Sequence, residues 1–480
     1  MDSFDLLVIG GGINGAAVAR DAAGRGLSVL LVEKDDLGAH TSSASSKLIH
    51  GGLRYLEQYD FRLVRESLLE REVMLRTAPH IIRPLRFILP DPPGGRPWWM
   101  VRAGLFLYDL LAGRSSLPRS RSVPKRESDV HAPLKQGFKL GAYWDAWVDD
   151  ARLVALNAVD AAERGARIAT RTEFLSARRD GEIWQAELSG GRSVSARMIV
   201  NAAGPWVSEV LGQRLGRGGR SGVRLVKGSH IAVPRLYEGD HAYILQQPDG
   251  RIVFALPYGA RNLIGTTDMP VTAPTDAAIS PEEINYLCAA ANRYFTRQIG
   301  PSDVLWSYSG IRALYDDGEA EARKVTRDYR LELDDADGPK LVSVFGGKLT
   351  TARALAAEAL EKLGISGLKF TTTSHLPGGD LNAAFHRVLE EIGAWMPAPM
   401  LDRLARAYGT RIYRAIDGAT SMDELGRHFG AGLHEVEVRY LMDVEFARTA
   451  EDVLWRRTKL GLEMSKREQD ALKKWMTAGG

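Results

Sequence analysis

The N-terminal glycines have the spacing of a turn that binds a dinucleotide. In the stretch GGGINGAAVARDAAGRG, Gly10 permits a tight turn, Gly12 lets the backbone approach a pyrophosphate, and Gly15 allows the following helix to pack closely. The N-terminus of that helix offers N–H donors and positive partial charge to phosphates. Glu33 ends the next apolar run, where a carboxylate binds ribose hydroxyls and would repel a 2′-phosphate. The pattern therefore favours NAD or FAD over NADP.

Two further features favour FAD over NAD. Residues 41–52, TSSASSKLIHGG, carry hydroxyls and small side chains that suit a second approach to pyrophosphate and ribityl groups. Much later, Ala202-Ala203-Gly204 and Gly346-Gly347-Lys348 each follow an apolar run, and small residues let the backbone come close to the edge of an isoalloxazine ring. Taken singly, each of these stretches could also be an ordinary turn between a strand and a helix.

The predicted elements place these residues at the ends of strands. Leu6–Ile9 and Leu27–Val32 are short apolar runs typical of buried parallel strands, and the helical stretch between them completes a βαβ unit. The other elements that the periodicity predicts are helices over 53–76, 152–164 and 349–363, a hairpin over 183–200 and a strand at 341–345. After a linker at 376–380 the pattern is almost entirely helical, which indicates a separate helical domain.

Composition and charge exclude several classes of protein. The 480 residues suffice for about three domains, and the 45% hydrophobic and 26% charged residues exclude wholesale disorder. A net charge of +3 gives no reason to expect a nucleic-acid binder. The single cysteine excludes a disulfide framework, a four-cysteine zinc site and an iron–sulfur cluster within this chain. Cys288 falls on the apolar face of a helix that begins with the capping box Ser280–Glu283, so we expect it to be buried.

Several longer motifs carry a resemblance to a known family. They are MDSFDLLVIGGGINGAAVARDAAGRGLSVLLVE, TSSASSKLIHGGLRYLE, DAWVDDARLV, NAAGPW, VKGSHI, YSGIRAL, VFGGKLTTAR and VLWRRTK. Together they resemble FAD-dependent glycerol-3-phosphate dehydrogenase, the aerobic bacterial enzyme, from residue 4 to about residue 460. The resemblance implies oxidation of sn-glycerol 3-phosphate to dihydroxyacetone phosphate by hydride transfer to FAD, with the electrons passed to membrane quinone.

The resemblance also implies a fold. We expect an α/β protein with a Rossmann-like, two-dinucleotide FAD-binding domain assembled from discontinuous segments, a β-rich substrate domain and a C-terminal helical domain. The FAD-binding domain is expected over residues 1–76, 145–215 and 305–375. The substrate domain is expected over 77–144 and 216–304, and the helical domain over 381–480.

Fixed cations are expected around the phosphate monoester that the resemblance implies as substrate. The planar fork of arginine suits bidentate phosphate binding. The resemblance places Arg54 and Arg312 at the phosphate, with Tyr55 beside them, and Arg327 and Lys348 nearer the hydroxyl and the flavin. For any one arginine, a solvated position or a surface ion pair is the alternative interpretation.

The oxidation also requires a base for the hydroxyl proton. His50 and His230 are the candidates, because histidine titrates near the operating pH, and His230 in KGSH is preferred. Lys348 is a rival base if its pKa is depressed, and a cationic Lys348 would stabilise a developing alkoxide. His428 and His434 lack a third ligand nearby in sequence, so no metal site is expected.

The expected cofactor contacts come from several stretches of the chain. The FAD-binding residues that we expect are Gly10, Gly12, Asn14, Gly15, Glu33, Lys34, Thr41, Ser42, Ser45, Ser46, Leu48, His50, Phe174, Ala203, Gly204, Gly347, Lys348, Leu349 and Thr350.

One apolar run bears on the electron acceptor. Trp98–Ala112 is interrupted only by Arg102 and Asp109 and is followed by basic residues. It is too short to span a bilayer but fits a helix that lies in a membrane interface, with a buried helix of the substrate domain as the alternative. Asp2 and Asp5 occupy the place of a signal peptide's positive charge, so no signal peptide is expected. We therefore expect a peripheral protein at the cytoplasmic face of the inner membrane or in the cytoplasm.

Two other functions stay open at this level. A glycerol-3-phosphate oxidase of similar sequence would pass electrons to oxygen and make hydrogen peroxide. A flavin-carrying RNA-binding or scaffold protein would need a basic stripe, which the near-neutral charge disfavours. The sequence leaves the oligomeric state open, a homodimer included.

Overall fold

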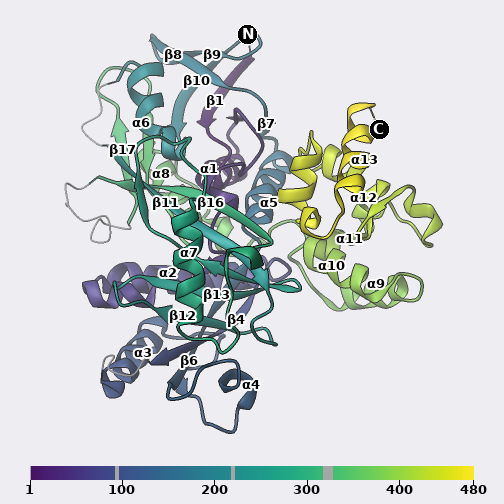
Figure 1. Ribbon diagram of the computed structural model, residues 1–480. Helices are drawn as coiled ribbons and strands as arrows, with labels where there is room; N and C mark the ends of the chain where they lie inside the picture. The colour runs from purple at the N-terminus through teal and green to yellow at the C-terminus, as the bar shows by residue number, and fades with distance from the viewer. Residues whose placement is uncertain (1, 92–96, 218–221, 317–327, 480) are drawn as a thin grey trace.

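A buried strand–helix–strand unit begins the fold in the computed structural model, which describes residues 2–91, 97–217, 222–316 and 328–479 (Figure 1). Strand β1 (Asp2–Ile9) pairs in parallel with β2 (Val29–Val32), and helix α1 (Ile13–Gly24) connects them. The first strand ends directly before Gly10 and the second directly before Glu33, as the sequence predicts.

This unit lies inside an eight-stranded, mostly parallel sheet. Its order is β17-β18-β10-β1-β2-β7, and the β8–β9 hairpin is attached to β10. The further strands are β7 (Arg167–Ala169), β8 (Phe174–Asp180), β9 (Ile183–Leu188), β10 (Arg192–Asn201), β17 (Arg330–Asp334) and β18 (Leu341–Phe345). Helices α1, α5 (Asp150–Glu163) and α8 (Ala352–Lys362) pack on one face in a shared apolar core. The other face packs on the hairpin and on the short helix α6 (Val207–Glu209).

A second sheet of ten strands stands beside the first. Its order is β15-β11-β14-β13-β12-β4-β6-β3, with β16 paired to β11 and β5 to β6. The strands are β3 (Leu48–Ile49), β4 (Ile82–Asp91), β5 (Arg121–Ser122), β6 (Lys139–Val148), β11 (Val223–Pro234), β12 (Ala242–Gln246), β13 (Ile252–Tyr258), β14 (Arg261–Gly265), β15 (Met269–Val271) and β16 (Trp306–Tyr315).

Helices cover both faces of this second sheet. On one face lies α7 (Pro281–Asn292), which begins at the predicted capping box and buries Cys288 as expected. On the other face, α2 (Phe61–Thr77) and α3 (Trp98–Ala112) share a core with β4 and β12. A short helix, α4 (Ser128–His131), lies in the connection before β6.

Two sequence-based assignments need correction. The helix expected over 53–76 is broken into a 3₁₀ segment, Leu53–Gln58, and α2, because Tyr59 is left-handed and Asp60 caps the new helix at the Leu63 amide. Strands β3 and β16 belong to the second sheet, although their residues fall inside the segments assigned to the FAD-binding domain. Local periodicity predicts a strand but does not say which sheet it joins.

The C-terminal residues form a helical unit with its own core. It contains α9 (Ala383–Gly393), α10 (Ala398–Tyr408), α11 (Ile412–Ala415), α12 (Glu435–Asp443) and α13 (Lys466–Thr477), with a small hairpin of β19 (His428–Gly430) and β20 (Leu433–His434). Figure 1 shows this unit to one side of the molecule, next to α5. A buried ion pair joins them, because Arg152 of α5 donates to both oxygens of Glu445 at 3.0 and 2.8 Å.

None of the helices in the described ranges combines the length and hydropathy needed to span a bilayer.

Candidate active site

A cavity of about 470 Å³ lies between the two sheets. One end is formed by the turns that follow β1, β2, β10 and β18, and the other by residues of β11, β12, β13 and β16. The carboxyl ends of parallel strands are where α/β sheets bind their ligands. The cavity therefore joins the predicted dinucleotide turn to the β-rich part of the chain.

The glycine turn is fixed by close backbone contact. Gly10 has φ +106°, and a Cβ there would lie 2.6 Å from the carbonyl oxygen of Ala202. A Cβ at Gly15 would lie 1.9 Å from the carbonyl oxygen of Gly10. Gly10 and Gly12 line the cavity, whereas Gly15 packs α1 on β1 and does not line it. The tight turn at Gly10 and the close packing at Gly15 agree with the spacing, whereas the approach of Gly12 to a pyrophosphate stays a prediction.

Glu33 lies directly after β2, where the sequence predicts a carboxylate that binds the ribose. Its carboxylate accepts hydrogen bonds from the amides of Gly11 at 2.7 Å and Asp35 at 2.9 Å. Burial raises the pKa of this carboxyl, and the two amide bonds oppose that rise. Each carboxylate oxygen can accept a second hydrogen bond, so the group can still bind hydroxyls presented from the cavity.

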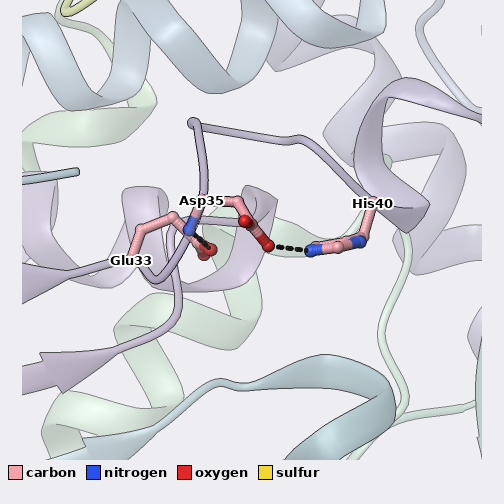
Figure 2. Close-up of side chains that lie close together, drawn as sticks. All are labelled: Glu33, Asp35 and His40. Atoms are coloured by element: carbon pink, nitrogen blue, oxygen red, sulfur yellow. Dashed lines mark hydrogen bonds and ion pairs between the residues drawn. The ribbon is translucent and has the colours of Figure 1, made fainter. Parts of the chain in front are cut away.

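Two neighbours of Glu33 could join it around a metal ion. Ligand atoms of Glu33, Asp35 and His40 lie within 4.8 Å of one another. Figure 2 shows that Asp35 instead pairs with His40, at 2.8 Å, while the Glu33 carboxylate turns to the amide of Asp35. The polar groups of this loop are thus used to fix its own conformation.

A distant segment completes the glycine turn. Asn14 Nδ2 donates to the carbonyl of Gly346 at 3.1 Å, and a Cβ at Gly347 would lie 2.7 Å from the same Nδ2. Asn14 Oδ1 is shielded from solvent and has no hydrogen-bond partner among the described residues. This acceptor is therefore available to a ligand in the cavity.

The serine-rich stretch lies along the same cavity. Ser42 Oγ accepts from the Ile13 amide at 3.0 Å, and Thr41 Oγ1 donates to the Ile311 carbonyl at 2.6 Å. Both side chains thus tie this stretch to other cavity walls. The remaining predicted cofactor residues that line the cavity are Lys34, Ser45, Ser46, Leu48, His50, Phe174, Ala203, Gly204, Lys348, Leu349 and Thr350.

His230 lies at the far end, on β11. Its Nε2 is 2.9 Å from Ser46 Oγ, its ring stacks on Tyr308 with centroids 4.8 Å apart, and its Nδ1 has no hydrogen-bond partner in the part of the chain described. Burial, with a contribution from Lys47 and Arg312, lowers the pKa of His230 to about 3. The imidazole is therefore neutral at pH 7.

Lys348 adds a lysine side chain to the cavity lining. Its Nζ lies 4.2 Å from the centre of the Tyr55 ring, is shielded from solvent, and has no hydrogen-bond partner among the described residues. Loss of hydration and the charge of Lys348 lower the pKa of His50 to about 4. Like His230, His50 is therefore a neutral imidazole at pH 7.

Arg312 of β16 also lines the cavity. It donates to the Thr267 carbonyl at 2.9 Å and pairs with Asp268 at 3.3 Å. A Cβ at Gly228 would lie 2.3 Å from Arg312 Nη2, so that glycine leaves room for the guanidinium. The side chain of Arg54 and the whole of Arg327 fall outside the described residues, so their predicted roles are not tested.

The sequence analysis missed a buried ion pair behind the cavity wall. Lys47 Nζ and Asp150 Oδ2 lie 2.9 Å apart, and both side chains are at most 1% exposed. Asp150 also accepts a hydrogen bond from Ser45 Oγ at 2.7 Å. The hydroxyl of Ser45, a predicted cofactor residue, therefore donates its hydrogen bond to another protein side chain. The acid stands in the quoted stretch DAWVDDARLV, but nothing in sequence spacing connects it to Lys47.

Comparison with known proteins identifies the family. The model of the FAD dependent oxidoreductase family matches residues 5–363, and that of the C-terminal domain of alpha-glycerophosphate oxidase matches residues 370–478. The chain belongs to the FAD dependent oxidoreductase family. The resemblance to its glycerol-3-phosphate dehydrogenase members is confirmed by relatives of 46–51% identity over nearly the full chain.

Individual relatives span almost the whole chain. Glycerol-3-phosphate dehydrogenase of Pseudomonas aeruginosa is 51% identical over 98% of this chain and 95% of its own. D-erythritol 1-phosphate dehydrogenase of Brucella abortus is 49% identical over 99% and 98%. The solved glycerol-3-phosphate dehydrogenase from Bacillus halodurans complexed with FAD has a TM-score of 0.76 at 26% identity, covering 99% and 90%.

These findings confirm the expected fold class and the cofactor FAD. The residues present fit FAD: Gly10 and Gly12 line the cavity at the turn after β1, and Asn14 Oδ1 and Glu33 offer hydrogen-bond acceptors. Glu33 would hold the ribose and the turn after β1 the pyrophosphate.

The neutral state of His230 predicts a pH dependence of stability. Histidine in the unfolded chain titrates near 6.5, whereas His230 in the folded protein titrates near 3, so the unfolded state binds more protons between these values. Stability is therefore present above pH 6.5 and is lost as the pH falls. We expect wild type to lose about 2 kcal/mol more than His230→Asn between pH 7.5 and pH 5.0.

Urea unfolding of both proteins at the two pH values measures this difference. Equal losses in wild type and variant would contradict a neutral, buried His230.

Proposed function

We propose that this chain oxidises sn-glycerol 3-phosphate to dihydroxyacetone phosphate with FAD and passes the electrons to membrane quinone. The observation that carries the proposal is the grouping of neutral His230, cationic Lys348 and Arg312 around one cavity that also holds the cofactor turns. The names of relatives at 46–51% identity support the same substrate.

Each of these residues has a role in the proposed reaction. When bound, FAD accepts the hydride from the alcohol carbon. Arg312 binds the phosphate through charge-assisted hydrogen bonds. His230 takes the hydroxyl proton at its unpartnered Nδ1, and Lys348 stabilises the negative charge that develops on the oxygen.

A second candidate substrate is D-erythritol 1-phosphate. The relative from Brucella abortus that carries this substrate in its name is as similar to the chain as the glycerol-3-phosphate dehydrogenases are. The cavity also reaches Gln246 and Arg251, where polar side chains could bind the hydroxyls of a longer chain. Both substrates are polyol monophosphates, so the same cations would serve either one.

Anaerobic reduction of the bound flavin tests the function. Glycerol 3-phosphate should bleach the absorbance of bound FAD within seconds, while glycerol, which lacks the phosphate, should not. D-erythritol 1-phosphate is added in a parallel experiment, and the ratio of the two kcat/KM values decides between the substrates. If neither phosphate bleaches the flavin, the proposed reaction is wrong.

The proposed roles of Lys348 and Arg312 predict different kinetic effects. We expect Lys348→Met to lower kcat about 100-fold, because it removes a cation that acts mainly on charge developing in the transition state. Arg312→Met should raise KM at least tenfold, because a charge-assisted hydrogen bond contributes about 1.5–3 kcal/mol to binding. Steady-state kinetics with a soluble dye, on variants with full FAD content, separates the two effects. Equal changes of kcat and KM in both variants would contradict the division of roles.

The exposed face of α3 supports the quinone as acceptor. Leu105 and Tyr108 are buried, whereas Trp99, Phe106 and Leu110 are 69%, 65% and 64% exposed and follow one another along the helix at turn spacing. The buried face belongs to the same packed cluster as Phe87, Leu89, Ile244 and Phe254, which form the apolar side of the cavity. An interfacial α3 would bring the end of the cavity that the second sheet forms near the lipid, at the cytoplasmic face of the inner membrane.

The oxidase alternative is not favoured. Relatives at 46–51% identity carry the name dehydrogenase, and the solved L-alpha-glycerophosphate oxidase from Mycoplasma pneumoniae is 19% identical.

If α3 docks on the membrane, changing its exposed side chains should abolish vesicle binding and quinone reduction but leave dye reduction intact. The triple variant Trp99→Ser, Phe106→Ser, Leu110→Ser should no longer co-sediment with vesicles of phosphatidylethanolamine and phosphatidylglycerol, and should lose quinone reduction. Dye reduction should persist, because these side chains are exposed and outside the cavity. A matched control replaces three exposed leucines elsewhere by serine: Leu175, Leu305 and Leu368. Vesicle binding that survives in the α3 variant, or that is lost equally in the control, would contradict docking through α3.

A further inference from the structure

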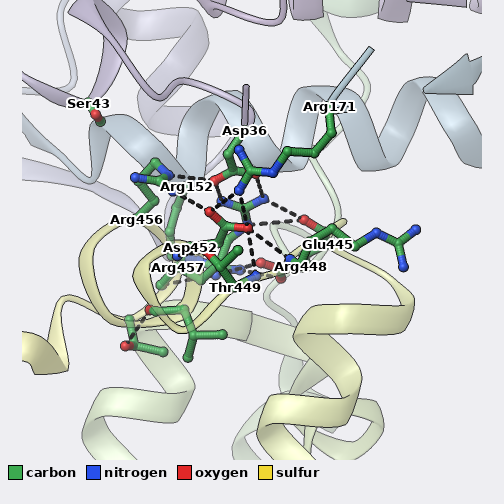
Figure 3. A network of polar contacts seen from close by, with 12 residues as sticks. Asp36, Ser43, Arg152, Arg171, Glu445, Arg448, Thr449, Asp452, Arg456 and Arg457 are labelled. Carbon is green, nitrogen blue, oxygen red and sulfur yellow. Dashed lines mark hydrogen bonds and ion pairs between the residues drawn. The ribbon is translucent and has the colours of Figure 1, made fainter. Parts of the chain in front are cut away.

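The C-terminal unit contacts the loop that follows Glu33, the carboxylate expected to bind the ribose of FAD. Arg457 donates to both oxygens of Asp36, at 2.7 and 2.8 Å, and Arg456 donates to the same carboxylate at 2.5 Å. The side chains of Asp36 and Arg457 are fully buried. Figure 3 shows the two arginines of the C-terminal segment converging on Asp36, with Arg152 and Glu445 close by. A bidentate pair of this kind fixes position as well as charge.

The loop held by Arg457 is bonded to the glycine turn. The amide of Gly38 donates to the carbonyl of Gly11 at 2.9 Å, and the amide of Gly11 donates to Glu33. The backbone amide of Asp35, next to Asp36, donates a hydrogen bond to the carboxylate of Glu33. A displacement of Asp36 would therefore move the carboxylate that faces the ribose and the backbone that faces the pyrophosphate.

A second residue of the same C-terminal segment reaches the other end of the cofactor loop. Lys459 Nζ contacts Asp149 and lies 3.3 Å from Asp150 Oδ1. Asp150 in turn holds Lys47 and the hydroxyl of Ser45, both within the serine-rich stretch that lines the cavity. Three cations within four residues of the C-terminal unit thus contact three carboxylates, those of Asp36, Asp149 and Asp150.

The burial of these carboxylates makes the dependence strong. Asp36 and Asp150 are 1% and 0% exposed, so neither can replace a lost cation with bulk water unless the loop moves. Removing one partner of a buried ion pair leaves a charge without compensation. The loop conformation that binds the cofactor is therefore coupled to the C-terminal segment.

We propose that residues 456–459 of the C-terminal unit position the loop of residues 33–47 for FAD, with Arg457 acting through Asp36 and Lys459 through Asp149 and Asp150. These are positioning residues, because Arg457 and Lys459 do not line the cavity. The proposal depends on FAD as the cofactor and not on the identity of the substrate.

The dissociation constant of FAD, titrated by flavin fluorescence into deflavinated full-length protein, tests the proposal. Asp36→Asn is the main variant, because it keeps the size of the side chain and the bonds of Arg457 to the Glu445 carbonyl. We expect its FAD dissociation constant to rise at least tenfold, and Arg457→Lys to show a smaller rise, since a lysine keeps the charge but loses the bidentate geometry.

The matched control is Arg411→Met, which breaks another ion pair between the C-terminal unit and α5. Arg411 pairs with Glu163 at the far end of α5, and neither residue lines the cofactor cavity. We expect its FAD dissociation constant to stay within twofold of wild type, even where its Tm falls as much as that of Asp36→Asn.

Kinetics separates positioning from general damage to the fold. At saturating FAD, Asp36→Asn and Arg457→Lys should recover a kcat within threefold of wild type with unchanged substrate KM. An FAD dissociation constant within twofold of wild type in both variants would overturn the proposal, as would equal weakening in Arg411→Met. A failure of glycerol 3-phosphate to reduce the flavin would leave these FAD titrations intact, so the two proposals can fail separately.

Discussion

The cofactor end of the cavity depends on a steric constraint near the end of β1, where three glycines lie against neighbouring atoms with no space for a side chain. Gly10 lies against the carbonyl of Ala202, Gly15 against the carbonyl of Gly10, and Gly347 against Asn14. The contact at Gly10 brings the end of β10 against the end of β1, and the contact at Gly347 brings the turn after β18 against the start of α1. A methyl group at any of these glycines would push apart segments that have to touch.

Charged side chains around the cavity fall into two groups: ion pairs buried behind its lining, and residues in the lining itself. The ion pairs Lys47–Asp150 and Arg457–Asp36 stand behind the wall, where each charge is compensated by a partner from a distant part of the chain. Lys348 lies in the cavity lining, where its charge helps to lower the pKa of His50, while burial and the charges of Lys47 and Arg312 lower the pKa of His230. The cavity lining thus combines a lysine with two imidazoles that are neutral at pH 7.

The sequence predicts local features well and long-range ones poorly. The strand Leu341–Phe345 and the helix Trp98–Ala112 have the bounds expected, because an apolar run or a helical period is complete within each. The sheet that β16 joins cannot be read from its own residues, since a strand pairs with partners far away in the chain. The glycine turn and Glu33 follow from spacing, whereas the pair of Asp36 and Arg457 spans 421 residues and leaves no periodic signal.

The distances along the chain that separate these partners also determine when the site can form. Asn14 and Gly346 are 332 residues apart, and Asp36 and Arg457 are 421 apart, so contacting residues at this site are separated by most of the chain. Closing such long loops costs more conformational entropy than forming the local strand–helix–strand unit. The flavin pocket therefore depends on contacts of the kind that form slowly, whereas its glycine turn lies within a unit whose contacts are local.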